Sequence, residues 1–415
     1  MAKISGFPAR RAALKITDAV LRRGETMEQA EGPALSGIHA PADRALARAL
    51  AAEALRWLTD LDLLIDSATK KRLPDDAKAR SVLRLMLAGW LRLETPPHAV
   101  IATGLELLTG GPRRLAHGVF STLSKQEVTL PDVPTLPDSV MVRWGDLAED
   151  IAKGLGDPPE LDLALKDASQ TQSMATSMEG VSLAEGHLRL PRGTAIEKLD
   201  GYKDGAWWVQ DLAAQIPVSL LGKGEGRNVL DLCAAPGGKT LGLAAAGWNV
   251  TALDMSKRRL ELLKDNLKRT GLKASPVRAD ALTWEPKNQF DAILLDAPCT
   301  ASGTCRRHPD VLHRIGGRQI EEMTSIQSAL IEKAATWLKQ GGVLIYAVCS
   351  LEAEEGEEQA ERIPETTGLE LKPVSAEELP AGLKPTKQGW VRTHPGMLKE
   401  QGGLDGFFIG RFVKP

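Results

Sequence analysis

The sequence has little of several features that define common protein classes. Only four of its 415 residues are cysteines, too few for a disulfide scaffold in a chain this long, which favours a reducing compartment. No stretch reaches the roughly 18 apolar residues of a membrane span, and the first residues lack the apolar run of a secretion signal. The sequence therefore predicts a cytoplasmic protein without a membrane-spanning segment.

Charge of one sign is not in excess either. The chain has 52 Lys and Arg against 54 Asp and Glu, a formal net charge of -2. Any nucleic acid would therefore bind local basic patches rather than the overall field. Aromatic residues make up 4%, whereas 43% of residues are hydrophobic and 26% are charged. This composition excludes a disordered tail and predicts about two or three globular domains.

The first part of the chain predicts a helical domain. Between about residues 8 and 126, apolar residues return at three- and four-residue steps, and proline or glycine clusters separate the runs. We expect a bundle of about five to seven amphipathic helices within residues 1–128. Prolines then make residues 128–137 extended. We assign residues 129–205 to this linker and a small connecting subdomain, with a helix over 140–155.

From about residue 206 the pattern changes to buried strands that alternate with helices. The apolar runs 228–233, 249–254, 290–296 and 342–348 are typical of strands covered on both faces. Such alternation predicts a doubly wound parallel α/β sheet, which we place in residues 206–415. The acidic run 352–358 fits a solvated helix start.

The turn after the first of these strands stands where an open α/β sheet binds its cofactor. Residues 231–240, DLCAAPGGKT, match neither a phosphate-cradling loop nor a dinucleotide fingerprint. Asp254 ends the next strand, where a carboxylate can accept hydrogen bonds from ribose hydroxyls, and Asp280 is placed near an adenine edge. This set suits S-adenosylmethionine, a nucleoside cofactor without a pyrophosphate. The alternative is a turn for close packing beside ordinary surface aspartates.

Cys299 and Cys349 follow two further strands at the same sheet edge. Each could be a small buried hydrophobe, and the cysteine and histidine spacings do not predict a zinc site. A thiolate that adds to C6 of cytosine makes C5 nucleophilic enough to accept a methyl group. Asp296 is near enough to hydrogen-bond N3 of the ring, for which it would be protonated or share a proton. The second cysteine could assist the final elimination.

Together, these motifs resemble the Fmu/Sun-type members of the RNA cytosine-C5 methyltransferase family. The matching segments in the C-terminal half are 209–215, 231–240, Asp254, Asp280, 296–303, 306–310, 348–350 and 405–408. The first half is similar to the family's NusB-like helical domain at residues 43–45, 82–85 and 95–99. The resemblance implies a Rossmann-like S-adenosylmethionine methyltransferase sheet preceded by an all-α domain.

The resemblance also implies a role for each site residue. Cys349 would be the nucleophile, Cys299 would help to release the product, and Asp296 would border the target base and the cofactor. Asp254 would hold the ribose and Asp280 the adenine. The methionine end of the cofactor would be wrapped mainly by main chain at Cys233, Ala234, Ala235, Pro236, Gly237, Gly238 and Lys239. In DNA cytosine methyltransferases the thiol equivalent to Cys299 attacks instead, so Cys349 favours RNA.

Two stretches depart from the family pattern. Residues 161–166 lack the family's usual Arg and Asn, and residues 117–124 replace its usual Asn-Ala-Val-Leu-Arg helix. Cys305 has no role in the family, and we interpret it as a passive thiol.

RNA contacts are expected close to the second cysteine loop. Arg306, Arg307 and His308 could bind phosphates that flank the target nucleotide, although a solvated turn is the alternative. From the resemblance alone we expect an enzyme that acts on 16S rRNA. We also expect a monomer without a metal. Two other functions stay open: a DNA cytosine methyltransferase, and an RNA-binding, antitermination-like protein with an inert α/β domain.

Overall fold

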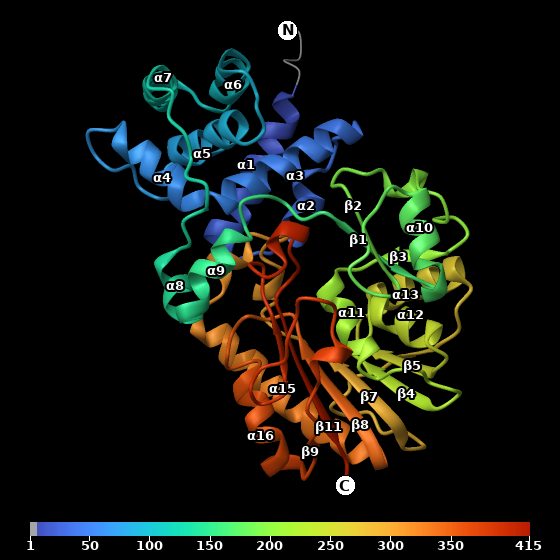
Figure 1. Ribbon diagram of the computed structural model, residues 1–415. Helices are drawn as coiled ribbons and strands as arrows, with labels where there is room; N and C mark the ends of the chain where they lie inside the picture. The colour runs from blue at the N-terminus through green and yellow to red at the C-terminus, as the bar shows by residue number, and fades with distance from the viewer. Residues whose placement is uncertain (1–5) are drawn as a thin grey trace. The chain divides into compact units, whose positions relative to one another are not determined.

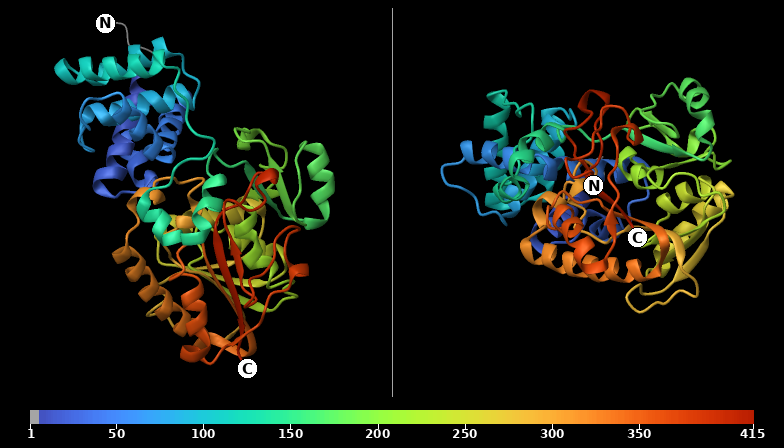
Figure 2. Two further views of the ribbon diagram at one scale, coloured as in Figure 1. Left: turned by 60° about the vertical axis from the view of Figure 1, so that its left-hand side comes forward. Right: turned by 60° about the horizontal axis from the view of Figure 1, so that its bottom comes forward.

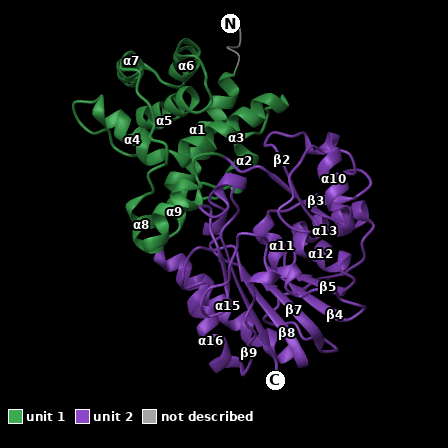
Figure 3. Cartoon of the chain, in the orientation of Figure 1, with its two compact units in different colours: residues 1–157, 307–315 green, residues 158–306, 316–415 purple. Residues whose placement is uncertain are grey.

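The computed structural model describes residues 6–415, whose contacts divide the chain into two compact units (Figure 3). The first unit contains the residues up to Asp157 together with Arg307–Ile315, and the second contains Pro158–Arg306 and Gly316–Pro415. The expected third region, residues 129–205, is therefore shared between the two units. Its first part joins the helices because the Asp60 carboxylate accepts hydrogen bonds from Thr135 N at 2.9 Å and Thr135 Oγ1 at 2.6 Å.

The first unit is helical and has its own apolar core. Seven α-helices lie between residues 6 and 125 of the described chain, within the predicted range: α1 (Phe7–Arg23), α2 (Met27–Ala34), α3 (Pro41–Arg56), α4 (Leu58–Ser67), α5 (Lys78–Leu91), α6 (Pro97–Gly104) and α7 (Gly110–Lys125). Thr26 begins α2 with a capping box, in which its side chain accepts from Gln29 N and Gln29 accepts from Thr26 N. None of the helices described in residues 6–415 is long and apolar enough to cross a membrane.

The helix expected over residues 140–155 is divided. It forms α8 (Asp138–Trp144), a short 3-10 turn η2 (Gly145–Leu147) and α9 (Ala148–Lys153). Gly145 ends α8 because it adopts a φ of 49°, a left-handed conformation that an α-helix cannot continue. The short helix α14 (Val311–Arg314) also belongs to this unit, where His313 Nε2 lies 2.7 Å from the Leu55 carbonyl oxygen.

The second unit begins with a small antiparallel sheet in the order β2-β1-β3. Its strands are β1 (Leu161–Leu165), β2 (His187–Leu190) and β3 (Trp207–Val209), with helix α10 (Thr171–Ser177) beside them. A buried ion pair between Asp162 and Arg189 joins β1 to β2 at 2.7 Å.

The main sheet of the second unit is mostly parallel. In the described chain it has eight strands in the order β10-β11-β8-β7-β4-β5-β6, with β9 paired to β11. They are β4 (Asn228–Leu232), β5 (Asn249–Asp254), β6 (Ser275–Arg278), β7 (Phe290–Asp296), β8 (Leu338–Val348), β9 (Glu370–Leu371), β10 (Val391–Thr393) and β11 (Phe407–Val413). The four strand runs predicted from the sequence are β4, β5, β7 and β8, and these pair in parallel. The order reverses between β4 and β7, and ligands bind at such switch points in open α/β sheets.

Helices cover both faces of this sheet (Figures 1 and 2). One face packs against α11 (Leu212–Ser219), α12 (Gly238–Ala245) and α13 (Lys257–Thr270), and the other against α15 (Gly317–Trp337) and α16 (Glu357–Thr367). Because both faces are buried, the central strands are rich in apolar residues, as in the sequence. The α/β sheet and the preceding helical domain confirm the predicted fold class.

Candidate active site

The carboxyl ends of neighbouring strands bring the predicted site residues together. β7 pairs with β4 on one side and with β8 on the other, and Asp296 lies opposite Ala347 in the β7–β8 register. The loop that follows β7 therefore lies beside the loop that follows β8. Cys299 and Cys349 lie one on each of these two loops.

The two cysteine sulfurs are in contact. Cys299 Sγ lies 3.4 Å from Cys349 Sγ, and both residues are half-buried free cysteines. The pKa of Cys299 is raised well above its usual value, first by the hydrogen bond with Cys349 and then by burial. Both effects favour the protonated form of Cys299. The sequence placed both thiols at one edge of the sheet, and the structure brings them within hydrogen-bond distance.

A close approach of two glycines holds the Cys299 loop against the end of the sheet. Gly303 N donates to the Cys349 carbonyl at 3.0 Å, and Gly406 N donates to the Gly303 carbonyl at 2.8 Å. A Cβ atom at Gly303 would lie 1.9 Å from the Gly406 carbonyl oxygen, so only glycine fits there. This contact explains why residues 296–303 and 405–408 both belong to the motif set.

The side chain of Lys239 adds a cation to the site. The sequence analysis assigned a role mainly to the main chain of this residue. Its Nζ lies 2.7 Å from Asp296 Oδ2, and the Lys239 side chain is only 9% exposed. Burial alone lowers the pKa of Lys239, but the nearby Asp296 and Cys349 charges raise it overall. The ammonium of Lys239 therefore stays charged beside the Asp296 side chain. Lys239 therefore has a proton that it can share with a substrate. The expectation that Asp296 is protonated, or shares a proton with N3, at the moment of attack stays a prediction.

The loop between β4 and α12 lies next to Asp254. This buried carboxylate accepts hydrogen bonds from Ala235 N at 3.1 Å and from Ser256 N at 2.8 Å. An ionised carboxylate has about four lone-pair sites, so Asp254 keeps acceptor capacity for ribose hydroxyls. Gly237 has a φ of 109°, where an added Cβ would lie 2.9 Å from the Leu263 side chain. The donors and acceptors of this loop fit a nucleoside cofactor.

Comparison with known proteins identifies the family. The profile described as 16S rRNA methyltransferase RsmB/F matches residues 218–413, and the NusB family profile matches residues 8–110. A relative from Citrobacter koseri, named Ribosomal RNA small subunit methyltransferase B, is 32% identical and aligns over 97% of this chain and 98% of its own length. The chain belongs to the RsmB/F family of 16S rRNA methyltransferases. As such it methylates ribosomal RNA and depends on S-adenosylmethionine.

Solved structures share the fold of this RsmB/F member. The structure of PH0851 matches 98% of this chain and 99% of its own, with a TM-score of 0.74 and 22% identity. A methyltransferase homologue protein from Pyrococcus horikoshii is 28% identical, covers 67% of this chain and 94% of its own, and has a TM-score of 0.55. The match to PH0851 covers both the helical and the α/β parts of this chain.

Asp280 and the other two cysteines of this RsmB/F member differ in their exposure to solvent. Asp280 is exposed after β6, and its Oδ1 accepts from Leu282 N at 3.0 Å. Cys233 adopts a φ of 66°, which is uncommon for a residue other than glycine and occurs often at functional sites. Burial, together with the negative charges of Asp296 and Asp254, raises the pKa of Cys233 to about 12, so this thiol stays neutral. Cys305 is fully buried in the core.

Arg306 has a different environment from the one that the sequence suggested. Its guanidinium is buried in the second unit, where NH2 lies 3.1 Å from Asp211 Oδ2 and Nε lies 3.3 Å from Asp405 Oδ1. NH1 donates to the Gly402 carbonyl at 2.7 Å. These contacts correct the expectation that Arg306 binds an RNA phosphate, because its donors are directed at protein acceptors. Arg307 and His308 lie in the segment assigned to the first unit, and their proposed RNA contacts stay predictions.

The acidic run after Cys349 is not a uniformly solvated surface. Glu352 and Glu355 are 1% and 0% exposed, whereas Glu354 and Glu358 are exposed. The run was expected to be solvated because charge in sequence usually marks a wet face. The burial of the two carboxylates Glu352 and Glu355 is therefore a feature that the charge pattern did not predict. Among residues 6–415, no cluster of His, Cys, Asp and Glu side chains could hold a metal ion.

Asp231, at the end of β4, is the most strongly perturbed carboxyl near the site. It is fully buried, its Oδ2 accepts from Thr240 Oγ1 at 2.5 Å, and its Oδ1 has no hydrogen-bond partner. Burial raises the pKa of Asp231 to about 7, with the Asp296 and Asp254 charges adding to the shift. The folded protein therefore binds a proton here over a pH range in which the unfolded chain has already lost it.

We predict that Asp231→Asn removes a pH-dependent penalty from the cofactor-free protein. As pH rises from about 4 to about 7, ionisation of Asp231 costs the folded state increasing free energy, on the order of 4 kcal/mol at the upper end. The free energy of unfolding of the variant minus that of the wild type should therefore increase as pH rises across this range. Denaturant titrations at several pH values measure it, and the difference should be constant above pH 7. If the free energy of unfolding of the variant minus that of the wild type falls as pH rises from about 4 to about 7, the assignment is contradicted.

Proposed function

We propose that this rRNA methyltransferase methylates C5 of a cytosine through a transient bond between Cys349 and C6 of the base. The observation that supports it most directly is the contact between Cys299 and Cys349, beside the Lys239–Asp296 ion pair. Two cysteines in contact at the cofactor edge of the sheet have no use in a methyl transfer to oxygen or to an exocyclic amine. Attack at C6 requires such a thiolate.

Each side chain then has a distinct task. Cys349 attacks C6, and the Lys239–Asp296 pair supplies a proton or a hydrogen bond to N3 as negative charge develops on the ring. S-adenosylmethionine, when bound, supplies the methyl group as an electrophile for C5. Cys299 assists the loss of the C5 proton, after which the Cys349 sulfur leaves C6. Once Cys349 is bonded to the ring, its charge no longer raises the pKa of Cys299, which favours a role for Cys299 in this last step.

The cofactor's contacts in this proposal follow from the donors and acceptors of the site. Asp254 binds the ribose hydroxyls and Asp280 the adenine amino group. The main chain of residues 233–239 contacts the methionine end, and Asp296 separates this end from the target base.

A mechanism-based trap tests the proposed attack. An RNA in which 5-fluorocytidine replaces the target cytidine cannot lose a C5 proton, so the enzyme should stay bonded to it after methyl transfer. We expect a denaturation-resistant protein–RNA complex with the wild type and none with Cys349→Ala. If Cys299→Ala loses the complex and Cys349→Ala keeps it, the two roles are reversed. Cys299 would then be the nucleophile, as expected of a DNA enzyme.

The natural RNA gives a second readout from the same variants. Cys299→Ala should form the Cys349 adduct and release it slowly, so that a covalent complex accumulates on unmodified RNA. Cys349→Ala should show no such complex and no methylation. If Cys299→Ala turns over as fast as the wild type, the elimination does not involve Cys299.

The RNA and the state of the enzyme are proposed on family grounds. We propose a cytosine of 16S rRNA as the target, taken from a loop or flipped from its helix, because a stacked base cannot present C6 to a thiol. Bisulfite mapping of ribosomal RNA from cells that lack the protein would locate that cytosine. The monomeric state, the cytoplasmic location, the absence of a metal and the domain bounds given from the sequence stay predictions.

A further inference from the structure

One buried carboxylate connects the two cysteine loops. Glu355 Oε1 accepts hydrogen bonds from Thr300 N at 2.9 Å and from Gln327 Nε2 at 3.0 Å. Glu355 Oε2 accepts from Thr300 Oγ1 at 2.5 Å and from Ser350 Oγ. Thr300 directly follows Cys299 and Ser350 directly follows Cys349, so both loops are tied to the same side chain.

The four hydrogen bonds also indicate the charge of Glu355. All four groups donate, and an ionised carboxylate accepts at about four lone-pair sites without a proton of its own. The donors are neutral, so the negative charge is stabilised by dipoles and is not cancelled by a cation among them. Hydrogen bonds to a charged group are stronger than neutral ones, which makes this connection stiff.

The charges around the cysteine pair are asymmetric. Glu355 lies next to Cys299, where its charge raises the pKa of that thiol after the larger effects of Cys349 and of burial. Cys299 packs against the core that contains α15, and Cys349 against the core that contains α12, the helix of Lys239. The Cys349 charge accordingly raises the pKa of Lys239. Tyr346, whose hydroxyl donates to the Glu355 carbonyl at 2.6 Å, stays neutral because burial raises its pKa. A negative group on the Cys299 side of the pair and a positive group on the Cys349 side favour a proton on Cys299.

We propose that Glu355 is a positioning residue that holds the two cysteine loops in contact and, by its charge, assigns the attack to Cys349. The charge assignment concerns the protein alone, whereas its consequence for methylation rests on the proposed function. Glu355 acts through the cysteines and does not touch the base. The shared proton of the pair is kept on Cys299, so that Cys349 is the nucleophile before RNA binds.

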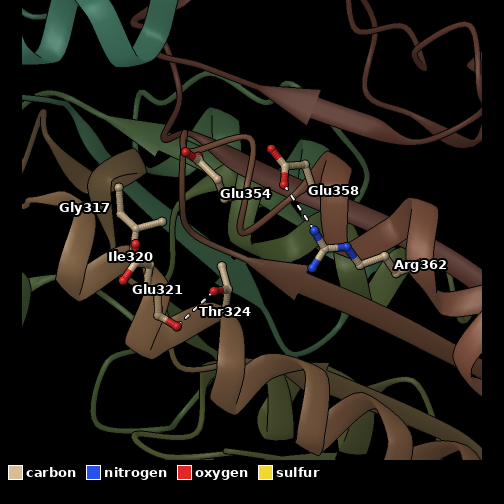
Figure 4. A pocket seen from close by; sticks show the side chains of 7 residues that line it. All are labelled: Gly317, Ile320, Glu321, Thr324, Glu354, Glu358 and Arg362. Atoms are coloured by element: carbon tan, nitrogen blue, oxygen red, sulfur yellow. Dashed lines mark hydrogen bonds and ion pairs between the residues drawn. The ribbon is translucent and has the colours of Figure 1, made fainter.

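The neighbouring residue Glu354 offers a matched control. Its side chain is exposed and lines a surface pocket of about 230 Å³ with six other residues, among them Glu321, Glu358 and Arg362 (Figure 4). Glu354→Gln removes the same charge one position away, on the outside of the loop. It should therefore leave the cysteine pair and the activity unchanged.

The charge assignment is tested by thiol labelling without RNA. The wild type and the Glu354→Gln and Glu355→Gln variants are treated with limiting iodoacetamide near neutral pH, and mass spectrometry of peptides gives the ratio of Cys349 to Cys299 alkylation. The wild type and Glu354→Gln should be labelled mainly at Cys349. In Glu355→Gln we expect this ratio to fall by about tenfold, which corresponds to one pKa unit. An unchanged ratio in a folded Glu355→Gln protein overturns the charge assignment.

A shorter acidic side chain separates position from charge and serves if Glu355→Gln does not fold. Glu355→Asp keeps the negative charge but cannot reach both loops, so the labelling ratio should stay close to that of the wild type. Formation of the 5-fluorocytidine adduct should nevertheless slow by about tenfold or more, with little change in KM for RNA. An Asp variant that traps RNA at the wild-type rate overturns the positioning role.

The proposed covalent mechanism and the proposed role of Glu355 are contradicted by different results. If the wild type forms no adduct with 5-fluorocytidine RNA, the proposed covalent mechanism is wrong, whatever the labelling ratios are. If the wild type forms the adduct through Cys349 and Glu355→Gln keeps the wild-type labelling ratio, only the role of Glu355 is wrong. A fall in the ratio confined to Glu355→Gln, together with slow trapping in Glu355→Asp, is the result that we expect.

Discussion

The Asp296→Asn enzyme is expected to transfer methyl groups about 10²- to 10⁴-fold more slowly than the wild type, the usual effect of losing a proton-transfer group. Its affinity for S-adenosylmethionine should change by less than about tenfold. The carboxylate of Asp296 pairs with Lys239 at 2.7 Å, and this pair is the proposed source of the hydrogen bond to N3 of the base. Asparagine keeps the shape of the side chain but removes the charge that holds the lysine ammonium in place.

The two effects are measured by different experiments. Single-turnover methylation at saturating cofactor reports the chemical step, and calorimetry with S-adenosylmethionine reports binding. Asp254→Asn is the matched control, because Asp254 is a buried carboxylate at the end of β5, two strands from β7 in the sheet, and is assigned to the ribose. That variant should bind the cofactor weakly and transfer the methyl group at a near-normal rate once saturated. Equal losses of binding and rate in Asp296→Asn would show that Asp296 serves the cofactor and not the base.

Much of the methyltransferase sheet could be predicted from the sequence because its central strands are buried on both faces. Residues 228–232, 249–254 and 290–296 are rich in Val, Leu, Ile and Ala, and such runs have few other interpretations when helices alternate with them. The antiparallel strands β10 and β11 were not predicted. The run 407–413 contains Gly410 and Arg411, and its pairing with β8 reverses the direction of the sheet, which no local pattern encodes.

The chemistry of the site was predictable for a related reason. Once the strands are assigned, a residue at the carboxyl end of a parallel strand must lie at the cofactor edge, as Asp254, Asp296 and Cys349 do. What could not be predicted is the partner of each side chain. Lys239 was assigned to the loop's main chain, and Glu355 to a solvated run, because contacts across 57 and 55 residues of sequence depend on tertiary structure alone.

Arg306 shows the same limit with a charged residue. In the sequence it stands beside Arg307 and His308 after a cysteine loop, a pattern that is typical of a phosphate-binding turn. In the structure Arg306 is buried, Arg307 is half-buried and His308 is exposed, so the three adjacent residues differ in their access to solvent. A run of basic residues in a sequence predicts a basic surface patch only if all of its side chains are in the same exposed environment.

Replacing Arg306 by methionine should therefore cost stability rather than RNA contacts. The guanidinium pairs with Asp211 and Asp405, and all three side chains are at most 5% exposed. Methionine fills most of the volume but removes the cation that pairs with these two buried carboxylates, and breaking a buried pair in this way costs about 3–5 kcal/mol. Urea unfolding followed by circular dichroism measures the loss.

The matched control is Arg318→Met on α15, where the arginine side chain is 92% exposed and pairs with Glu322 at 3.1 Å. That change should alter the free energy of unfolding by no more than about 0.5 kcal/mol, because surface ion pairs contribute little. RNA binding then distinguishes the two interpretations of Arg306. The Arg306→Met protein, at a temperature where it is still folded, should bind RNA with the affinity and salt dependence of the wild type. A phosphate contact would instead lower the slope of log K against log salt by about 1 without a loss of stability.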